Sequence, residues 1–203
     1  MTERISRDHP LLLASASPRR RELLELARIP FEVVRSGADE SIGKGEHALA
    51  YVARVARAKL AAAVVPLDEA TRTRAAIVLA ADTTVVLDGR VFGKPENDDD
   101  AREMLRALSG VKHEVVSAFA LGDPRTGRLV GEQTVRTLVE FRVLDAREID
   151  DYVSTAESRD KAGAYAIQGM ASALVRRIDG SHTNVIGLPT AELVMELRRL
   201  ELM

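Results

Sequence analysis

Apolar runs and amphipathic stretches alternate along the first third of the chain. The continuous apolar run at 11–15 predicts a short buried strand. Ser17 and the proline after it favour a helix start, so we expect a helix over 18–28. A second strand is expected at 31–36, followed by a polar, glycine-bearing loop at 37–46. A longer helix should come next, with a buried stripe of apolar residues at helical spacing: Val52, Val55, Ala56, Leu60 and Ala63.

The stretch 76–95 has the pattern of a strand that continues into a hairpin. We expect a buried strand that breaks at Asp82, and then a hairpin whose turn is Asp88-Gly89, a dipeptide typical of type I′ turns. The polar segment before it, 64–76, predicts an exposed loop or a short extra turn.

Helix caps and alternating residues define the rest of the chain. Asn97 is a favourable cap for a helix that ends at Leu108, and Asp145 with Glu148 has the form of a capping box. The other expected elements are strands at 113–122, 128–143, 164–169 and 173–178, a turn at 179–184 and a closing helix at 188–202. The pattern therefore predicts one α/β domain over 1–203 with a mixed sheet.

Composition narrows the class of protein. The 203 residues are 46% apolar and 30% charged, which is typical of a packed domain of enzyme size. A net charge of −2, an aromatic content of 3% and the lack of tryptophan argue against nucleic acid as a partner. The chain has no cysteine, and no apolar run is long enough for a signal peptide or a membrane span. We therefore expect a cytoplasmic protein that has no membrane partner.

Three arginines, Arg19, Arg20 and Arg21, occupy the first turn of the helix expected at 18–28. The helix dipole disfavours positive charge there by roughly 0.3–1 kcal/mol for each cation. A helix start with arginine side chains can bind an anion such as phosphate, but three solvated arginines would give the same pattern. The local sequence leaves both interpretations open.

Further candidate residues lie near the expected strand ends and loops. Asp82 follows a buried strand, the hairpin brings Lys94 back towards it, and Lys59 lies at the edge of an apolar helix stripe. Each residue also has an ordinary interpretation, as a turn residue, a surface lysine or a lysine that extends to solvent. If these residues and Glu40 surround phosphates, a divalent cation is needed to bridge the carboxylates. The set thus favours metal-assisted phosphate chemistry.

Several common site motifs are missing. The segment 37–45 imitates a phosphate-binding loop, but it has five residues between its glycines where the motif needs four, and no Ser or Thr follows Lys44. The sequence contains no serine-hydrolase G-x-S-x-G, no zinc H-E-x-x-H and no dinucleotide G-x-G-x-x-G pattern.

Three motifs occur in a specific order: SASPRR, AADTTVVLDGRVFGKP, and AYAIQG with VRRIDGSHTNVIGLP. Together they resemble the Maf family of nucleoside triphosphate pyrophosphatases, from about Leu11 to the C-terminal helix. The resemblance implies an α/β fold like that of inosine triphosphate pyrophosphatases, with an elongated, twisted mixed sheet flanked by helices and a cleft between two lobes. It also implies hydrolysis of a nucleoside triphosphate to the monophosphate and pyrophosphate with a divalent cation, Mg²⁺ or alternatively Mn²⁺.

The resemblance also assigns catalytic roles by position. Asp82 of the ADT triplet matches the proton acceptor, and Lys94 matches the lysine of GKP. Asp82 would either take the proton of the attacking water directly or hold the metal that lowers the pKa of that water. Glu40 and Lys59 match an acidic and a basic residue of the cleft by order and approximate spacing. The resemblance makes Asp82 and Glu40 the candidate metal ligands.

A second group of residues is expected to bind the substrate. Ser15, Ser17 and Arg19 would line the phosphate and base end of the cleft. Arg19, Thr83 and Gln168 match the trio that separates the dTTP/UTP branch of the family from a branch that resembles 7-methyl-GTP pyrophosphatases, and this sequence resembles the former. The Gln168 amide can match O4 and N3–H of uracil or thymine.

The expected function is therefore a house-cleaning dTTP/UTP pyrophosphatase, with modified pyrimidine nucleotides as further candidate substrates. The alternatives are a non-catalytic nucleotide sensor that acts through a partner and a pyrophosphatase of the same chemistry that prefers purines. The resemblance allows a homodimer, which no residue pattern shows independently. Three features depart from the family pattern: an N-terminal extension at 1–10, a long segment at 64–76, and His182 where relatives often carry an aromatic residue.

Overall fold

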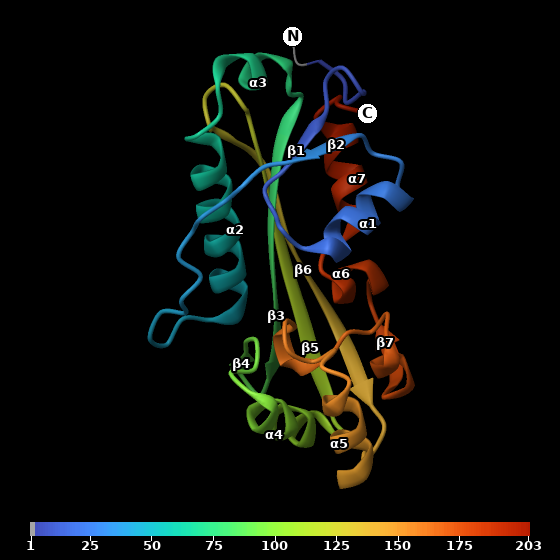
Figure 1. Ribbon diagram of the computed structural model, residues 1–203. Coiled ribbons are helices and arrows are strands. Elements are labelled where there is room, and N and C mark those ends of the chain that lie inside the picture. Colours follow the sequence, from blue (N-terminus) through green and yellow to red (C-terminus); the bar gives the residue numbers. More distant parts are fainter. Residues whose placement is uncertain (1–2) are drawn as a thin grey trace.

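A mixed sheet of seven strands runs the length of the molecule (Figure 1). The computed structural model describes residues 3–203, so the first two residues of the expected extension lie outside it. The strands are β1 (Leu11–Leu13), β2 (Phe31–Val33), β3 (Ile77–Leu87), β4 (Arg90–Phe92), β5 (Lys112–Gly122), β6 (Leu129–Phe141) and β7 (Val175–Asp179). Their order is β2-β1-β3-β5-β6-β7, with β4 also paired to β3. β1 is parallel to β2 and β3, and the other pairs are antiparallel, which confirms the expected mixed sheet.

Helices cover the two ends of the sheet differently (Figure 1). At the end near the chain termini, α2 lies on one face and α1 and α7 lie on the other, while α4 and α5 pack at the opposite end. The helices are α1 (Pro18–Leu26), α2 (Ala48–Val64), α3 (Glu69–Arg74), α4 (Asp98–Leu108), α5 (Ala146–Ser154), α6 (His182–Ile186) and α7 (Thr190–Arg199), with 3₁₀ turns η1 (Ala162–Ala164) and η2 (Met170–Ala173).

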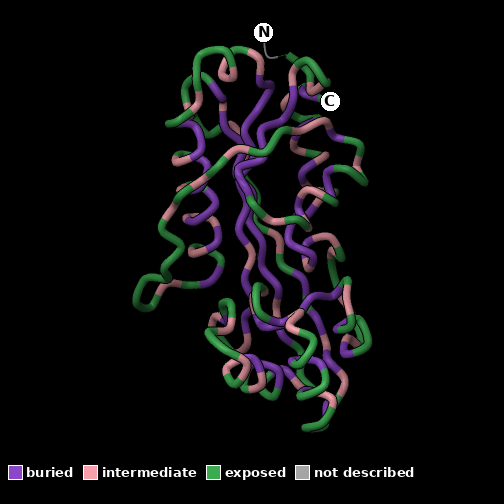
Figure 2. Tube along the Cα trace, in the orientation of Figure 1, coloured by how far each residue is buried: buried purple, intermediate pink, exposed green. Residues whose placement is uncertain are grey.

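Alternation along the strands builds two hydrophobic clusters in the first lobe, the end of the molecule that holds the termini. Leu11 and Leu13 pack with α1 and α7, whereas Leu12 between them packs with α2 on the other face. A third cluster fills the second lobe, where α4, α5 and η1 pack against β5 and β6. The buried positions follow the long strands from one lobe to the other (Figure 2). The sheet is therefore the continuous frame, and each lobe has its own core.

One edge of β3 is left open between the lobes. β5 pairs with one edge of β3 from Val78 to Val86. On the opposite edge, β1 reaches only as far as Leu79 and β4 begins only at Val85. Within the described residues, no strand pairs with this edge between those two positions. A gap of this kind is where an α/β sheet can admit a ligand.

The structure corrects the expected break at Asp82. β3 continues through this residue, because Asp82 is paired with Ala118 of β5 inside a ladder of nine residue pairs. The polar residue marks the open edge of the strand and not its end. The Asp88-Gly89 turn is confirmed, with φ of 50° and 78° as a type I′ turn requires.

The expected strand at 164–169 is also wrong. The segment contains the end of η1 and then irregular backbone, in which Tyr165 belongs to the core of the second lobe and Ile167 to a core of the first. The alternation of apolar residues thus reflects two separate cores and not the two faces of a strand.

Two segments expected as loops or turns contain helices. Asp68 caps α3 in the segment 64–76 by accepting a hydrogen bond from Thr71 N. Ser181 caps α6, which begins inside the expected turn at 179–184. The caps expected at Asn97 and Asp145 are confirmed, the second as a complete capping box.

The described part of the N-terminal extension packs on the first lobe. Ile5 N donates to Leu202 O at 2.8 Å, and His9 Nδ1 lies 3.0 Å from Arg74 O. The extension therefore forms a hydrogen bond with the C-terminal segment and contacts the end of α3. Among the described helices, none combines the length and the apolar character that a membrane crossing requires.

Candidate active site

A cavity of about 660 Å³ lies at the open edge of β3, between the two lobes. All nine residues singled out in the sequence line it: Ser15, Ser17, Arg19, Glu40, Lys59, Asp82, Thr83, Lys94 and Gln168. They come from segments that are far apart in the chain. The fold thus brings together the residues that the family resemblance assigned to one cleft.

The elements explain how these residues meet. The segment that contains Ser15 and Ser17 connects the end of β1 to the start of α1. It follows the last residue of β1 that pairs with β3. Asp82 and Thr83 lie in the stretch of β3 that has a partner strand on one edge only, and Lys94 follows β4 two residues after that strand ends. The cavity therefore occupies the gap that β1 and β4 leave beside β3.

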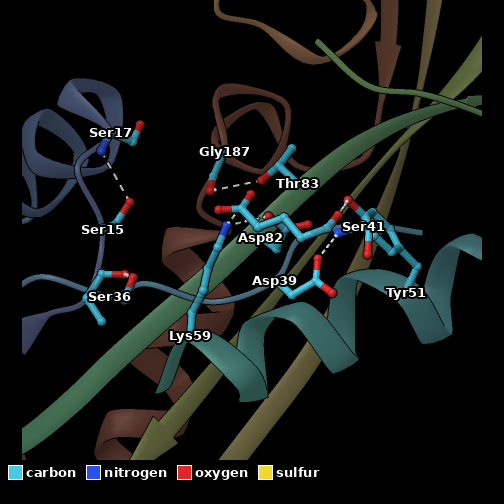
Figure 3. Close-up of polar contacts among 12 residues, drawn as sticks. Ser15, Ser17, Ser36, Asp39, Ser41, Tyr51, Lys59, Asp82, Thr83 and Gly187 are labelled. Carbon is cyan, nitrogen blue, oxygen red and sulfur yellow. Dashed lines mark hydrogen bonds and ion pairs between the residues drawn. The ribbon is translucent and has the colours of Figure 1, made fainter. Parts of the chain in front are cut away.

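Lys59 joins two carboxylates at the cavity wall. Its Nζ lies 2.8 Å from Asp82 Oδ1 and 2.9 Å from Glu40 Oε2 (Figure 3 shows Lys59 and Asp82). Lys59 and Asp82 are only 8% and 6% exposed. The hydroxyl of Tyr51 donates to the carbonyl oxygen of Glu40 at 2.9 Å, which ties the loop to α2. Lys59 therefore turns into the cavity and does not extend to solvent.

Arg20 is a cavity residue that the sequence analysis named only as one of three arginines at a helix start. Its guanidinium donates to Gly187 O at 2.9 Å, to Ser15 Oγ at 3.1 Å and to Thr83 Oγ1 at 3.2 Å. Burial lowers the pKa of Arg20, and the charge of Asp82 opposes this shift. Arg20 lies three and four residues before the buried Leu23 and Leu24, so it shares their helix face. This spacing is the sequence feature that indicates a buried position for Arg20.

The neighbouring Arg19 takes a different partner. Its guanidinium is 3.6 Å from the carboxylate of Asp160, which also pairs with Lys161. This contact links α1 of the first lobe to the segment that precedes η1 in the second lobe. Arg19 and Arg20 thus both line the cavity, which argues against the interpretation that the arginines of this turn are simply solvated.

Thr83 belongs to a chain of hydroxyl groups between β3, β5 and α6. Its Oγ1 donates to Gly187 O at 3.2 Å and lies 2.8 Å from Ser117 Oγ. Ser117 Oγ in turn donates to Asn184 O at 3.1 Å. Figure 3 shows Thr83 and Gly187 facing each other beside Asp82. These contacts fix the end of α6 against the neighbouring strands β3 and β5.

The charge of the cavity suits a polyanion held with a cation. Among the described residues, its lining has five cationic side chains, Arg19, Arg20, Lys59, Lys94 and Lys161, and three carboxylates, Glu40, Asp82 and Asp160. No cluster of three or more His, Cys, Asp or Glu side chains within the described part forms a metal cage. Asp82 and Glu40, which share one lysine, fit the small carboxylate set that a hard divalent cation uses when phosphates supply further oxygens.

The sequence pattern of the family described as Maf-like protein matches residues 10–200. This chain belongs to the Maf-like protein family. The Maf-like protein is 46% identical over 190 residues to a dTTP/UTP pyrophosphatase from Geotalea uraniireducens (strain Rf4), which covers 94% of each chain. It is 49% identical over 189 residues to a dTTP/UTP pyrophosphatase from Geobacter sp. (strain M21), with 93% of this chain and 94% of the relative covered. The family resemblance found in the motifs is confirmed.

Among solved structures, a HAM1 protein from Coxiella burnetii aligns with a TM-score of 0.46 at 17% identity, over 94% of this chain and 99% of that one.

Proposed function

We propose that this Maf-like protein hydrolyses dTTP and UTP to the nucleoside monophosphate and pyrophosphate. Its relatives from Geotalea and Geobacter carry the name of that activity. The observation that carries the proposal is the buried Lys59, held between Asp82 and Glu40 in a cavity otherwise rich in cations. A cation-lined pocket alone would bind a nucleotide, whereas a buried carboxylate beside the phosphates gives it a group that can act on water.

The reaction breaks the bond between the α-phosphorus and the oxygen that bridges to the β-phosphate. Water supplies the new oxygen on the α-phosphorus, its proton passes to Asp82, and pyrophosphate leaves with the bridging oxygen. Lys59 orients the Asp82 carboxylate through its 2.8 Å contact with Oδ1. Asp82 and Glu40 would hold a divalent cation, Mg²⁺ or Mn²⁺, which supplies charge neutralisation for the phosphates and makes water more acidic.

The remaining cations bind the phosphates in this proposal. Lys94, Arg19 and the start of α1 with Ser15 and Ser17 face the same space as Asp82. Charge grows on the departing pyrophosphate during the reaction, so cations placed in advance stabilise the transition state more than the ground state.

Base selection is assigned to Gln168, with Thr83 and Arg19. Gln168 lines the cavity on the segment between η1 and η2. Its amide has one donor and one acceptor group, which match O4 and N3–H of uracil and thymine, whereas the corresponding edge of cytosine is reversed.

Purified protein incubated with Mg²⁺ and each of dTTP, UTP, dCTP, CTP, dGTP and dATP tests the proposal, with products separated by ion-exchange chromatography. Monophosphate and pyrophosphate from dTTP and UTP in preference to the others would support it. Binding without turnover would indicate a nucleotide sensor, and faster turnover of purines would indicate a purine pyrophosphatase. Either result would overturn the proposed function.

A further inference from the structure

The segment that carries Gln168 has no regular secondary structure to hold it. It lies between η1 and η2, with Gln168 exposed to the cavity. Tyr165 and Ile167 anchor its first part in two different hydrophobic clusters. Gly169 N donates to Ala166 O at 3.1 Å, so residues 166–169 form a tight turn. Another contact must fix this turn relative to α5.

Two side chains outside the cavity form hydrogen bonds with the backbone at both ends of this turn. The Tyr152 hydroxyl on α5 accepts a hydrogen bond from Ala166 N at 3.3 Å and donates to Glu157 Oε1 at 3.0 Å. The other carboxylate oxygen, Oε2 of Glu157, accepts from Met170 N at 3.1 Å. The hydroxyl and the carboxylate therefore bridge the backbone on the two sides of Gln168. We refer to Tyr152 and Glu157 together as the clamp.

Gly169 is needed for this approach. A Cβ added at this position would collide with the Glu157 carboxyl group. The carboxylate thus lies directly against the backbone next to Gln168. Because a larger residue at position 169 would displace the Glu157 carboxylate from the Tyr152 hydroxyl and Met170 N, the clamp depends on the close fit of Glu157 and Gly169.

The Tyr152 hydroxyl is kept in the form that the clamp needs. Burial, and to a smaller extent the charge of Glu157, raises the pKa of Tyr152 above its ordinary value. The protonated hydroxyl can donate to the carboxylate and accept from Ala166 N at the same time.

We propose that Tyr152 and Glu157 are positioning residues for base selection, because they hold the backbone from which Gln168 reaches the base. The inference rests on the proposed function. Neither residue lines the cavity, and Asp82 and Lys59 are held by β3 and α2, elements that do not depend on the clamp. Hydrogen bonds weaken steeply when their geometry is poor, so a loosened turn reduces recognition of the base edge before it affects the reacting phosphate.

Tyr152→Phe and Glu157→Gln test this proposal through kcat and KM for UTP and CTP. We expect the ratio of kcat/KM for UTP over CTP to fall roughly tenfold in Tyr152→Phe, while kcat for UTP stays within about threefold of wild type. Glu157→Gln should give a smaller fall, since its amide oxygen can still accept one of the two hydrogen bonds.

Ser109→Ala is the matched control for the loss of a hydroxyl. Ser109 Oγ accepts a hydrogen bond from Leu144 N at 2.8 Å in the same lobe, but Ser109 does not line the cavity. This variant should lose thermal stability to a similar degree and keep the wild-type selectivity. A similar loss of selectivity in Ser109→Ala would overturn the inference, because general loosening of the lobe would then explain both results.

A double-mutant cycle with Gln168→Ala decides whether the clamp acts through Gln168. In the Gln168→Ala background, Tyr152→Phe should change the UTP/CTP ratio less than twofold. An undiminished effect there, or an unchanged ratio in Tyr152→Phe alone, would overturn the inference. If the wild-type protein hydrolyses neither nucleotide, the proposed function has failed. If the wild-type protein prefers UTP to CTP but the double-mutant cycle shows no coupling between Tyr152 and Gln168, the proposed function stands. Only the role of Tyr152 and Glu157 is then removed.

Discussion

In the proposed function the cavity has a reactive end at Asp82 and Lys59 and a base end at Gln168, and these two ends are built in different ways. At the reactive end, Asp82 lies on a strand of eleven residues and Lys59 on a helix of seventeen, and both elements pack over much of their length. At the base end, Gln168 lies on an irregular segment that Tyr152 and Glu157 tie to the second lobe. The comparison shows that a long regular element holds a side chain by many shared contacts, whereas a turn depends on a few named hydrogen bonds.

The largest effect is expected for Asp82→Asn at the reactive end. Loss of the proton acceptor should lower kcat by about 100-fold to 10,000-fold, since that range is typical for a positioned general base. The substitution preserves the shape of the side chain, so circular dichroism and dTTP binding measured by calorimetry should stay close to wild type. Wild-type turnover in this variant would remove the assigned role of Asp82.

Lys59→Met tests whether the buried ion pair between Lys59 and Asp82 stabilises the reactive end. The substitution leaves the buried Asp82 carboxylate without its lysine, and we expect a loss of about 3 kcal/mol in the free energy of unfolding from urea titrations. The matched control is Arg57→Gln on the same helix, because Arg57 makes an exposed pair with Glu132 at 3.5 Å. That control should lose less than about 1 kcal/mol. Equal losses would contradict the distinction between the two pairs.

The second lobe should respond to mild acid through His113. This residue is buried between Phe141 and Tyr165, and burial lowers its pKa to about 4 from the ordinary value of 6.5. Between these two pH values the unfolded chain binds a proton that the folded chain does not. Stability therefore falls as the pH is lowered from about 6.5, by up to roughly 1.4 kcal/mol for each pH unit.

Urea titrations at pH 7, 6 and 5 measure this slope, and His113→Gln should make it shallower. This pH range lies above the pH values at which exposed carboxylates titrate. Glu46, for example, has its pKa lowered to about 2 by its hydrogen bonds with Arg54, and its contribution is lost only as the pH falls below the ordinary carboxylate range. Identical slopes for the two proteins would show that His113 is not the group that titrates.

The smallest effect is expected for Gln168→Ala at the base end. The variant should lose discrimination between dTTP and dCTP by about tenfold, because it removes the donor and the acceptor that the proposed function assigns to the base edge. Its kcat for dTTP should fall by less than that, since Asp82 and Lys59 are untouched. Selectivity equal to wild type would place base recognition elsewhere in the cavity.

Sequence reasoning succeeded where the signal is local. The caps at Asn97 and Asp145 and the Asp88-Gly89 turn depend on residues within a few positions of each other, and the structure has all three. The nine candidate residues also share one cavity. They were chosen mainly through the family resemblance of the three motifs and not through local patterns alone. The spacing of Arg20 to Leu23 and Leu24 placed it on the buried face of α1, but its hydrogen-bond partner Gly187 is 167 positions away and could not be predicted from this local pattern.

The amino-acid sequence by itself determined most of the strands, the family and every helix except α3 and α6, because periodicity, capping and turn chemistry act over a few neighbouring residues. Only the tertiary structure decided that Asp82 stays inside a strand and that residues 164–169 form no strand. Both outcomes depend on distant partners: β5 pairs along the whole of the stretch that contains Asp82, and two separate cores take up Tyr165 and Ile167. Such contacts form only when the chain is folded, so no local pattern could encode them.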